Sequence, residues 1–362
     1  MSRIAIIDTA IDAAFIGGKA IEHINLCGSG NNYSHREISH GTFCAMALDI
    51  CASDYELVNI QIFKDNETKV FTEIELLARA LKLCKDLKID VVSLSAVSSV
   101  LSDSKHLYDI SKYLARDTVI VSALDNARYA TVPTSYPHVV GVSSDIACLL
   151  LPGEIAFWED APLGTNIYAN CEFPQLREQG CGPSNSIAVP VVAAYINDLI
   201  NQKKSILHIE SLLQKQKPYL ISKEAINIYY PAEPTEKEIP IVFLADSAIG
   251  VCSALMDNLY EKYEVQATAL SLVEAPYDVR IKSVKGADTI KDDLYFMERN
   301  YKTDLIFIIG EKSMLDEVRK IVDVDITLIC QDNAQTWLEY ENKRELILNS
   351  KVLEKLHSIL TE

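Results

Sequence analysis

The chain contains 362 residues, 49% of them apolar and 23% charged, and it carries a formal net charge of −17 at pH 7. This composition predicts a globular protein long enough for two domains, and the acidity disfavours binding to nucleic acid or an anionic membrane, because both partners attract lysine and arginine. The apolar runs are too short to span a bilayer, and the N-terminus lacks the features of a signal peptide. The nine cysteines are scattered and include no CxxC pair, which suggests neither disulfides nor a zinc site. We therefore expect a cytoplasmic protein.

The N-terminal part of the chain alternates between strand-like and helix-like segments. Strands are expected at 3–8, 57–62, 89–95, 118–123 and 138–142, and helices at 40–52, 72–87, 105–116, from about 186 onward, and at 206–214. Repeated βα units of this kind predict an α/β fold, with a mainly parallel sheet covered by helices on both faces.

A domain boundary is expected at residues 229–240, which contain three prolines and four charged residues and show no apolar period. We therefore predict a first domain at 1–230, a linker at 231–238 and a smaller three-layer α/β domain of Rossmann- or flavodoxin-like type at 239–362. In the second domain, strands are expected at 239–245, 265–272, 304–309 and 325–329, and helices at 247–262, 288–300, 312–322 and about 335–360.

Three short segments carry the residue types of one catalytic reaction. Asp8 ends the first predicted strand, His40 opens the first helix, and Ser186 opens the long helix. A serine hydroxyl barely ionises at pH 7, so its attack on an amide carbonyl needs a base, and histidine can take that proton and return it to the leaving amine. A carboxylate beside the imidazole would fix its tautomer and stabilise its cation. Together the three residues predict an Asp-His-Ser triad.

The sequence around these residues resembles the motifs of subtilases, the subtilisin-like serine peptidases, over residues about 3–215. Residues 8–12, Asp-Thr-Ala-Ile-Asp, resemble the family's Asp-Ser/Thr-Gly-Ile-Asp; residues 40–45 resemble His-Gly-Thr-x-x-Ala; and residues 186–190 resemble Ser-Met-Ala-x-Pro. The order Asp, His, Ser is also that of the family. The resemblance implies a subtilisin-like sheet, with Ser186 as nucleophile, His40 as base and Asp8 as the orienting carboxylate.

Two further segments extend the resemblance. Residues 119–126 and the following Tyr-Pro-His-Val-Val-Gly-Val are similar to a family strand that ends in Asn and its Tyr-Pro-x-Val segment. This implies that the Asn126 amide donates to the oxyanion together with the backbone N–H of Ser186. Residues 90–95 resemble the strand that binds an extended substrate by β-augmentation. The implied substrate-binding residues are Ser93, Leu94, Ser95, Ala96, Val97, Ala123, Leu124 and Asp125.

Several positions depart from the family pattern. Ala10, residues 96–97 and residues 124–125 stand where glycines are usual, and bulkier residues would narrow or reshape a peptide cleft. Asn185 replaces the usual Thr before the nucleophile and, because Asn tolerates unusual φ values, it could still occupy the turn there. Ser184 is the alternative nucleophile. The family's inhibitory propeptide has no room before the first catalytic residue, so we expect folding without self-cleavage.

The sequence thus predicts an intracellular serine endopeptidase that cleaves an extended peptide or flexible protein segment through an acyl-enzyme, in a setting such as leader-peptide removal during maturation of a ribosomally made peptide. Two alternatives use the same scaffold: a catalytically inactive peptide-binding pseudopeptidase, and a transpeptidase or macrocyclase. No cofactor and no metal are expected. The smaller domain is expected to serve substrate selection, docking or homo-oligomerisation, and an anion site at 245–250 is the alternative.

Overall fold

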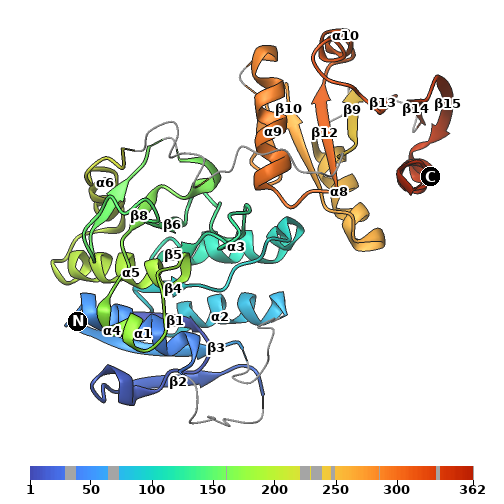
Figure 1. The fold of residues 1–362 in the computed structure, drawn as a ribbon. Helices are drawn as coiled ribbons and strands as arrows, with labels where there is room; N and C mark the ends of the chain where they lie inside the picture. Colours follow the sequence, from blue (N-terminus) through green and yellow to red (C-terminus); the bar gives the residue numbers. More distant parts are fainter. Residues whose placement is uncertain are drawn as a thin grey trace. The chain divides into compact units, whose positions relative to one another are not determined.

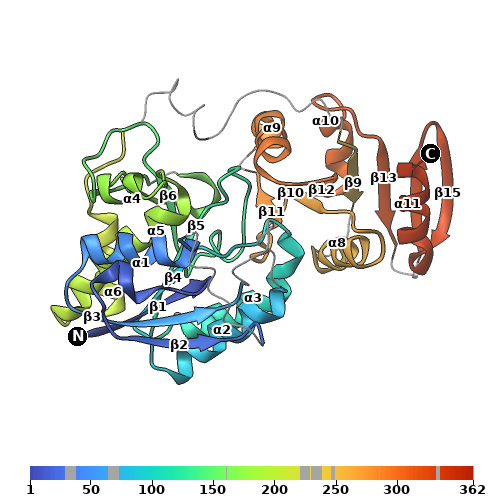
Figure 2. The ribbon, with the colours of Figure 1, turned by 60° about the horizontal axis from the view of Figure 1, so that its bottom comes forward.

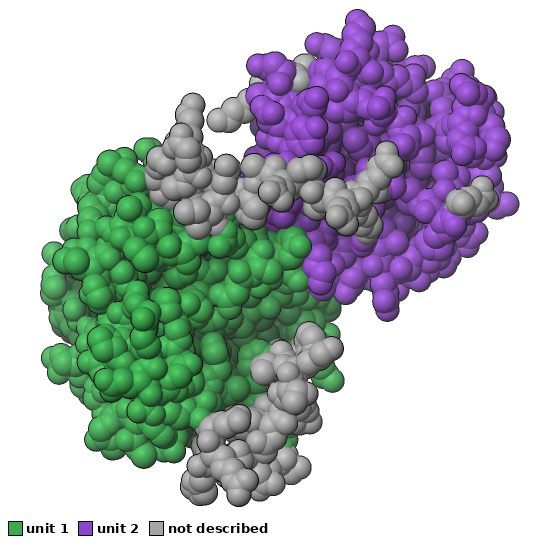
Figure 3. Space-filling view, viewed as in Figure 1, with its two compact units in different colours: residues 1–99, 103–229 green, residues 100–102, 230–362 purple. Residues whose placement is uncertain are grey.

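The computed structural model describes residues 1–28, 38–63, 73–159, 161–220, 229, 239–245, 249–284, 286–331 and 335–361 (Figure 1). The chain forms two compact units (Figure 3): unit 1 comprises Met1–Ser99 and Asp103–Tyr229, and unit 2 comprises Val100–Ser102 and Tyr230–Glu362. The predicted linker at 231–238 and residues 246–248 of the predicted anion segment lie outside the described residues. Among the described residues, no helix has the length and hydropathy needed to cross a lipid bilayer.

Unit 1 is built on a sheet that has eight strands among the described residues, in the order β2-β3-β1-β4-β5-β6-β8-β7. The strands are β1 (Ser2–Asp8), β2 (Ile21–Asn25), β3 (Tyr55–Gln61), β4 (Val91–Leu94), β5 (Val119–Ala123), β6 (Val140–Ser144), β7 (Ile155–Phe157) and β8 (Ile167–Ala169). Neighbouring strands run parallel, except that β7 is antiparallel to β8. The carboxyl ends of β1, β4 and β5 therefore meet at one edge of the sheet, where α/β folds place their sites.

Helices cover both faces of this sheet. They are α1 (His40–Cys51), α2 (Ile74–Asp86), α3 (Ser104–Leu114), α4 (Pro174–Glu178), α5 (Asn185–Asn201) and α6 (Ile206–Gln214), with short 3₁₀ turns at Ala13–Ile16, Leu101–Asp103 and Pro162–Gly164. Figure 2 shows α1 and α5 on one face and α2 and α3 on the other. Because α5 crosses the centre of the sheet, it is apolar and buried on almost every side, and it forms one core with α1.

The predicted fold class is confirmed, since both sheets are mainly parallel and carry helices on both faces. The helices and strands predicted in unit 1 lie within a few residues of the observed ones. Three strands of unit 1 were not predicted: β2, β7 and β8. β7 and β8 have three residues each, which is too short for a clear alternating pattern, and no residue of β2 is fully buried, so β2 lacks the apolar run of the central strands.

Unit 2 contains a sheet with seven strands among the described residues, in the order β11-β10-β12-β9-β13-β14-β15. The strands are β9 (Ile241–Ala245), β10 (Ala267–Ser271), β11 (Ile281–Ser283), β12 (Leu305–Gly310), β13 (Ile326–Cys330), β14 (Gln335–Tyr340) and β15 (Lys343–Leu348). The helices are α8 (Ile249–Tyr263), α9 (Ile290–Asn300), α10 (Leu315–Val318) and α11 (Val352–Thr361), with 3₁₀ turns at Ala287–Thr289, Lys312–Met314 and Asn349–Lys351. Side chains of α8 and α11 form the core on one face, and those of α9 and α10 form it on the other.

The helix predicted at about 335–360 is wrong for residues 335–348, which form the antiparallel hairpin of β14 and β15; the helical part begins with the 3₁₀ turn at Asn349–Lys351 and continues as α11. Within β14, Thr336 and Leu338 are buried and their neighbours are partly exposed, so the burial alternates with the period of a strand. Between the strands, Glu341 and Asn342 have φ values of 45° and 63°. Two consecutive positive φ values are typical of the tight turns that join hairpin strands.

Candidate active site

Asp8 is the last residue of β1, and its side chain is only 3% exposed. The backbone N–H of Thr9 donates to Asp8 Oδ1 at 2.7 Å, and the Thr9 hydroxyl lies 3.3 Å from the same oxygen. That hydroxyl also accepts the backbone N–H of Gly41 at 2.7 Å. Thr9 therefore fixes the carboxylate and joins the end of β1 to the start of α1.

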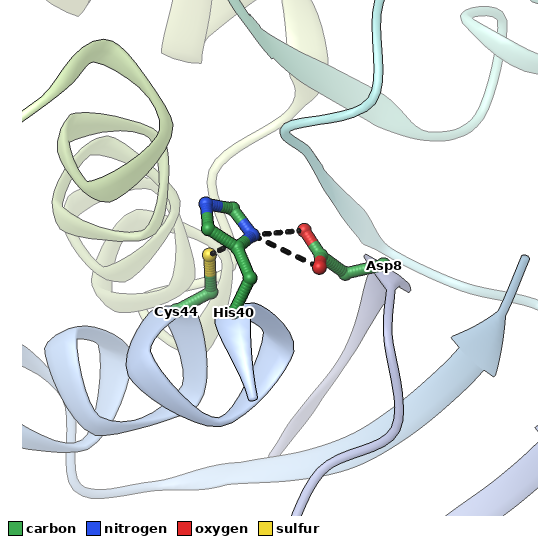
Figure 4. Close-up of side chains that lie close together, drawn as sticks. All are labelled: Asp8, His40 and Cys44. Carbon is green, nitrogen blue, oxygen red and sulfur yellow. Dashed lines mark hydrogen bonds and ion pairs between the residues drawn. The ribbon is translucent and has the colours of Figure 1, made fainter. Parts of the chain in front are cut away.

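His40 is the first residue of α1, where Ser39 caps the helix by accepting the N–H of Thr42 at 3.2 Å. The ring nitrogen Nδ1 lies 2.9 Å from Asp8 Oδ1 and 2.8 Å from Asp8 Oδ2, whereas the other ring nitrogen points away from Asp8 (Figure 4). A carboxylate only accepts, so Nδ1 carries a proton and Nε2 of the neutral ring is the acceptor. The His40 side chain is 43% exposed. A buried carboxylate thus orients an accessible imidazole.

Gly41 allows this close approach of α1 to β1. A Cβ atom at this position would lie 2.5 Å from the backbone oxygen of Thr9 and 3.1 Å from its hydroxyl oxygen. Real Cβ atoms do not come that near to a backbone oxygen, so any side chain at Gly41 would push His40 away from Asp8.

The charge of Asp8, followed by the Cys44 sulfur, raises the pKa of His40 well above its ordinary value of 6.5, and burial opposes this shift. Part of the Asp8 effect is screened by water, because the imidazole is partly exposed. A higher pKa makes the imidazole a stronger base and stabilises the cation that forms when it accepts a proton. It also lowers the fraction of neutral imidazole at a given pH.

Ser186 is the second residue of α5. Ser184 precedes the helix with extended backbone (φ −155°, ψ 166°), and its hydroxyl caps the helix by accepting the N–H of Ile187 at 3.4 Å. Asn185 is the first helical residue and does not have a positive φ, so the tolerance of Asn for unusual φ values is not needed here. Among the described residues, the Ser186 hydroxyl has no hydrogen-bond partner, and no bond joins it to His40.

The Ser186 carbonyl is held by two side chains from other elements. Pro190 lies four residues further along α5 and has no N–H, so this carbonyl lacks its ordinary helical partner. It accepts instead from the Ser95 hydroxyl at 3.2 Å and from the Cys44 thiol at 3.8 Å. Cys44 Sγ in turn lies 3.8 Å from His40 Nδ1. These contacts bring the start of α5 beside the Asp8–His40 pair.

Asn126 follows β5 at the same edge of the sheet, and its side chain is exposed. Its Oδ1 accepts the backbone N–H of Asn185 at 3.1 Å. The structure therefore places this amide at the start of α5, next to the residue that precedes Ser186, and within the described part of the chain its Nδ2 has no partner.

The predicted substrate-binding residues fall into two groups. Ser93 and Leu94 pair with β1 on one side and β5 on the other, so β4 has no free edge for a substrate strand. Five of the eight residues are buried: Ser93, Leu94, Ala96, Ala123 and Leu124. Beyond β4, Ser98 pairs with Val132. A substrate role stays a prediction for the side chains of Ser95, Val97 and Asp125, which are partly exposed, and for the backbone of Ser95–Val97.

Asp8, His40 and Cys44 form one cluster in which a carboxylate oxygen, an imidazole nitrogen and a thiol sulfur lie within 4.8 Å of one another. Such donors are those that Zn²⁺ takes. The nitrogen and the carboxylate are already joined by a hydrogen bond, so a metal ion would have to displace the proton between them.

No family model and no curated protein matches the chain. Among solved structures, it is similar to the prenylagaramide maturation protease PagA (17% identity, 56% of this chain and 78% of that one, TM-score 0.36) and to a lanthipeptide protease (15%, 59% and 79%, 0.44). A third is the PatG macrocyclase in complex with peptide (13%, 57% and 78%, 0.35).

Three residues of the site were not identified from the sequence as parts of it. Thr9 and Cys44 could have been found by spacing, because Thr9 adjoins Asp8 and Cys44 lies one helical turn after His40. Asn185 had no such signal, because the partners of its side chain come from the end of β6 and the loop after β5, which are distant in the sequence.

Proposed function

We propose that this protein is a serine endopeptidase that cleaves an extended peptide through an acyl-enzyme. The observation that carries the proposal is the buried Asp8 carboxylate bonded to the Nδ1 of an accessible His40, with the first turn of α5 and its Ser186 attached to the same cluster through Cys44 and Ser95. This combination supplies a hydroxyl, a base and a group that orients the base.

In the proposed reaction, the Ser186 oxygen attacks the peptide carbonyl carbon while its proton passes to Nε2 of His40. The negative charge that develops on the carbonyl oxygen is stabilised by Asn126 Nδ2 and by the N–H of Ser186, one of the unpaired donors of the first turn of α5. When the C–N bond breaks, His40 returns the proton to the leaving amine, and the ester on Ser186 remains. Water then attacks the ester, and His40 again takes and returns a proton.

As part of the same proposal, we place this activity in the cytoplasm, in the maturation of a ribosomally made peptide from which a leader is removed. This setting is supported by the motif resemblance. An extended or flexible segment is the substrate because a folded chain cannot present its backbone to the segment at Ser95–Val97.

A fluorophosphonate probe tests the nucleophile. It should label the folded wild-type protein at a single site, which peptide mapping by mass spectrometry would place on Ser186. Ser186→Ala should abolish labelling, whereas Ser184→Ala should retain it and lose about 1 kcal/mol of stability, because Ser184 caps the helix. Labelling on Ser184, or no labelling of folded protein, would overturn the assignment, and the second result would favour a peptide-binding pseudopeptidase.

The products separate hydrolysis from transpeptidation. A peptide library incubated in ¹⁸O-labelled water should yield fragments with one ¹⁸O in the new carboxylate, because water resolves the ester in the proposed reaction. Products without ¹⁸O that join two peptides, or that close one peptide on itself, would show that an amine resolves the ester instead. Mass spectrometry of the same mixture would report the preferred cleavage site.

A further inference from the structure

The Asn185 side chain joins three elements of unit 1 and is only 6% exposed. Its Oδ1 accepts the backbone N–H of Ser144 at 2.8 Å and the hydroxyls of Ser144 and Ser143 at 3.1 and 3.2 Å. Its Nδ2 donates to the backbone oxygen of Asp125 at 3.2 Å. One amide therefore connects the start of α5 with the end of β6 and with the loop after β5.

The backbone of Asn185 fixes the orientation of a second amide. Its N–H is one of the free donors at the start of α5, and it donates to Asn126 Oδ1 at 3.1 Å. A backbone N–H can only donate, so the atom of Asn126 that faces it is the oxygen. Asn126 Nδ2 is thereby kept off the helix and available to a ligand.

We propose that Asn185 is a positioning residue for the oxyanion site: its side chain ties the Asp125–Asn126 loop to α5 and β6, so that Asn126 Nδ2 and the N–H of Ser186 keep a fixed separation. This inference rests on the proposed function. The position needs a side chain that accepts at one end and donates at the other, because its partners are a backbone N–H on one side and a backbone oxygen on the other. Among uncharged side chains of this length, only Asn meets both needs.

A double-mutant cycle between Asn185 and Asn126 tests the proposal. Loss of one oxyanion donor lowers kcat by roughly 100- to 1000-fold, so misplacing that donor in Asn185→Ala should lower kcat by about 10- to 100-fold, with KM changed less than about threefold. In the Asn126→Ala background, Asn185→Ala should lower kcat by less than about threefold further, because a residue that acts through another has nothing left to position. Asn185→Ser, which retains one hydrogen-bonding group, covers the case in which the alanine variant does not fold.

Asn197→Ala is the matched control. Asn197 lies on the same helix, is fully buried, and bonds through its side chain to Ser2 and Asp198. It lies 12 residues beyond Asn185, which is about 18 Å along the helix axis. We expect it to lose comparable thermal stability while kcat changes less than about twofold. An equal fall in kcat in both variants would mean that Asn185 is merely structural and would overturn the proposal.

A measurement that needs no turnover separates this inference from the proposed function. The side-chain amide resonance of Asn126, assigned by its loss in Asn126→Ala, should shift in Asn185→Ala and stay in place in Asn197→Ala. If the wild type neither reacts with the probe nor cleaves peptide, the proposed function fails and this shift still decides the positioning role. Additive losses of kcat in the cycle, or an unmoved resonance, would overturn the inference itself.

Discussion

Replacing Asp8 by Asn should abolish most activity by changing which ring nitrogen of His40 carries the proton. The backbone N–H of Thr9 donates to Asp8 Oδ1 at 2.7 Å, so in the variant the amide oxygen must keep that position. The new NH₂ group then occupies the position of Oδ2, which lies 2.8 Å from Nδ1 of His40. Nδ1 also lies 2.9 Å from the retained oxygen, but a protonated Nδ1 would face the new NH₂ donor at 2.8 Å, so we expect Nε2 to carry the proton instead.

An imidazole ring protonated at Nε2 cannot accept the proton of Ser186, although the ring itself keeps its position. The expected fall in kcat is about ten-thousandfold, the size of effect that a wrong tautomer produces in a triad of this type. The assay is kcat and KM on a peptide found in the library screen, together with ¹⁵N NMR of labelled histidine, which distinguishes the two tautomers.

Asp12→Asn is the control for this prediction. Asp12 caps the 3₁₀ turn at 13–16 by accepting the N–H of Ala14 at 3.0 Å, a role that Asn also performs, so activity should change less than about twofold. An Asp8→Asn variant that keeps more than about a tenth of wild-type kcat, or whose His40 retains the proton on Nδ1, would refute the reasoning.

Three further predictions concern pH and stability. In ¹⁵N NMR, His40 should titrate well above pH 6.5 in the wild type and near or below pH 6.5 once the Asp8 carboxylate is replaced. Because only the neutral imidazole is a base, kcat/KM of the wild type should rise with pH through the pKa of His40. A wild-type midpoint near pH 6.5 would contradict this prediction. Gly41→Ala would place a Cβ 2.5 Å from a backbone oxygen and should lower the free energy of unfolding by about 1–3 kcal/mol, as measured by denaturant titration. In the control Gly182→Ala, the Cβ would meet no atom within 4 Å, and the free energy of unfolding should change by less than about 0.5 kcal/mol. Glu341→Gly should raise the stability of unit 2 by about 0.5–1 kcal/mol because φ is 45° there, and Glu339→Gly, inside β14, should lower it; equal signs would refute the turn geometry.

The parts of the site that could be predicted from sequence are those set by local pattern. Asp8 ends a strand and His40 opens a capped helix, and both features are visible in a few consecutive residues. The meeting of the carboxyl ends of β1 and β5 follows from parallel βα topology, which brings Asp8 and Asn126 to one edge of the sheet.

The parts that could not be predicted depend on which elements become neighbours. Ser93 and Leu94 are interior because β4 lies between β1 and β5, an order that the sequence of β4 does not contain. The hairpin of β14 and β15 was mistaken for helix because its turn, Glu341–Asn342, lacks the glycine that usually indicates a tight hairpin. The role of Asn185 depends on Ser144 and Asp125, which only the folded chain brings together.

Pro190 makes the start of α5 depend on the rest of unit 1. In an isolated helix of this sequence the Ser186 carbonyl would have no donor, because the N–H that Pro190 lacks is its ordinary partner within the helix. The bonds from Ser95 and Cys44 exist only when β4, α1 and α5 have all assembled. The geometry around Ser186, the proposed nucleophile, therefore forms only as unit 1 folds cooperatively.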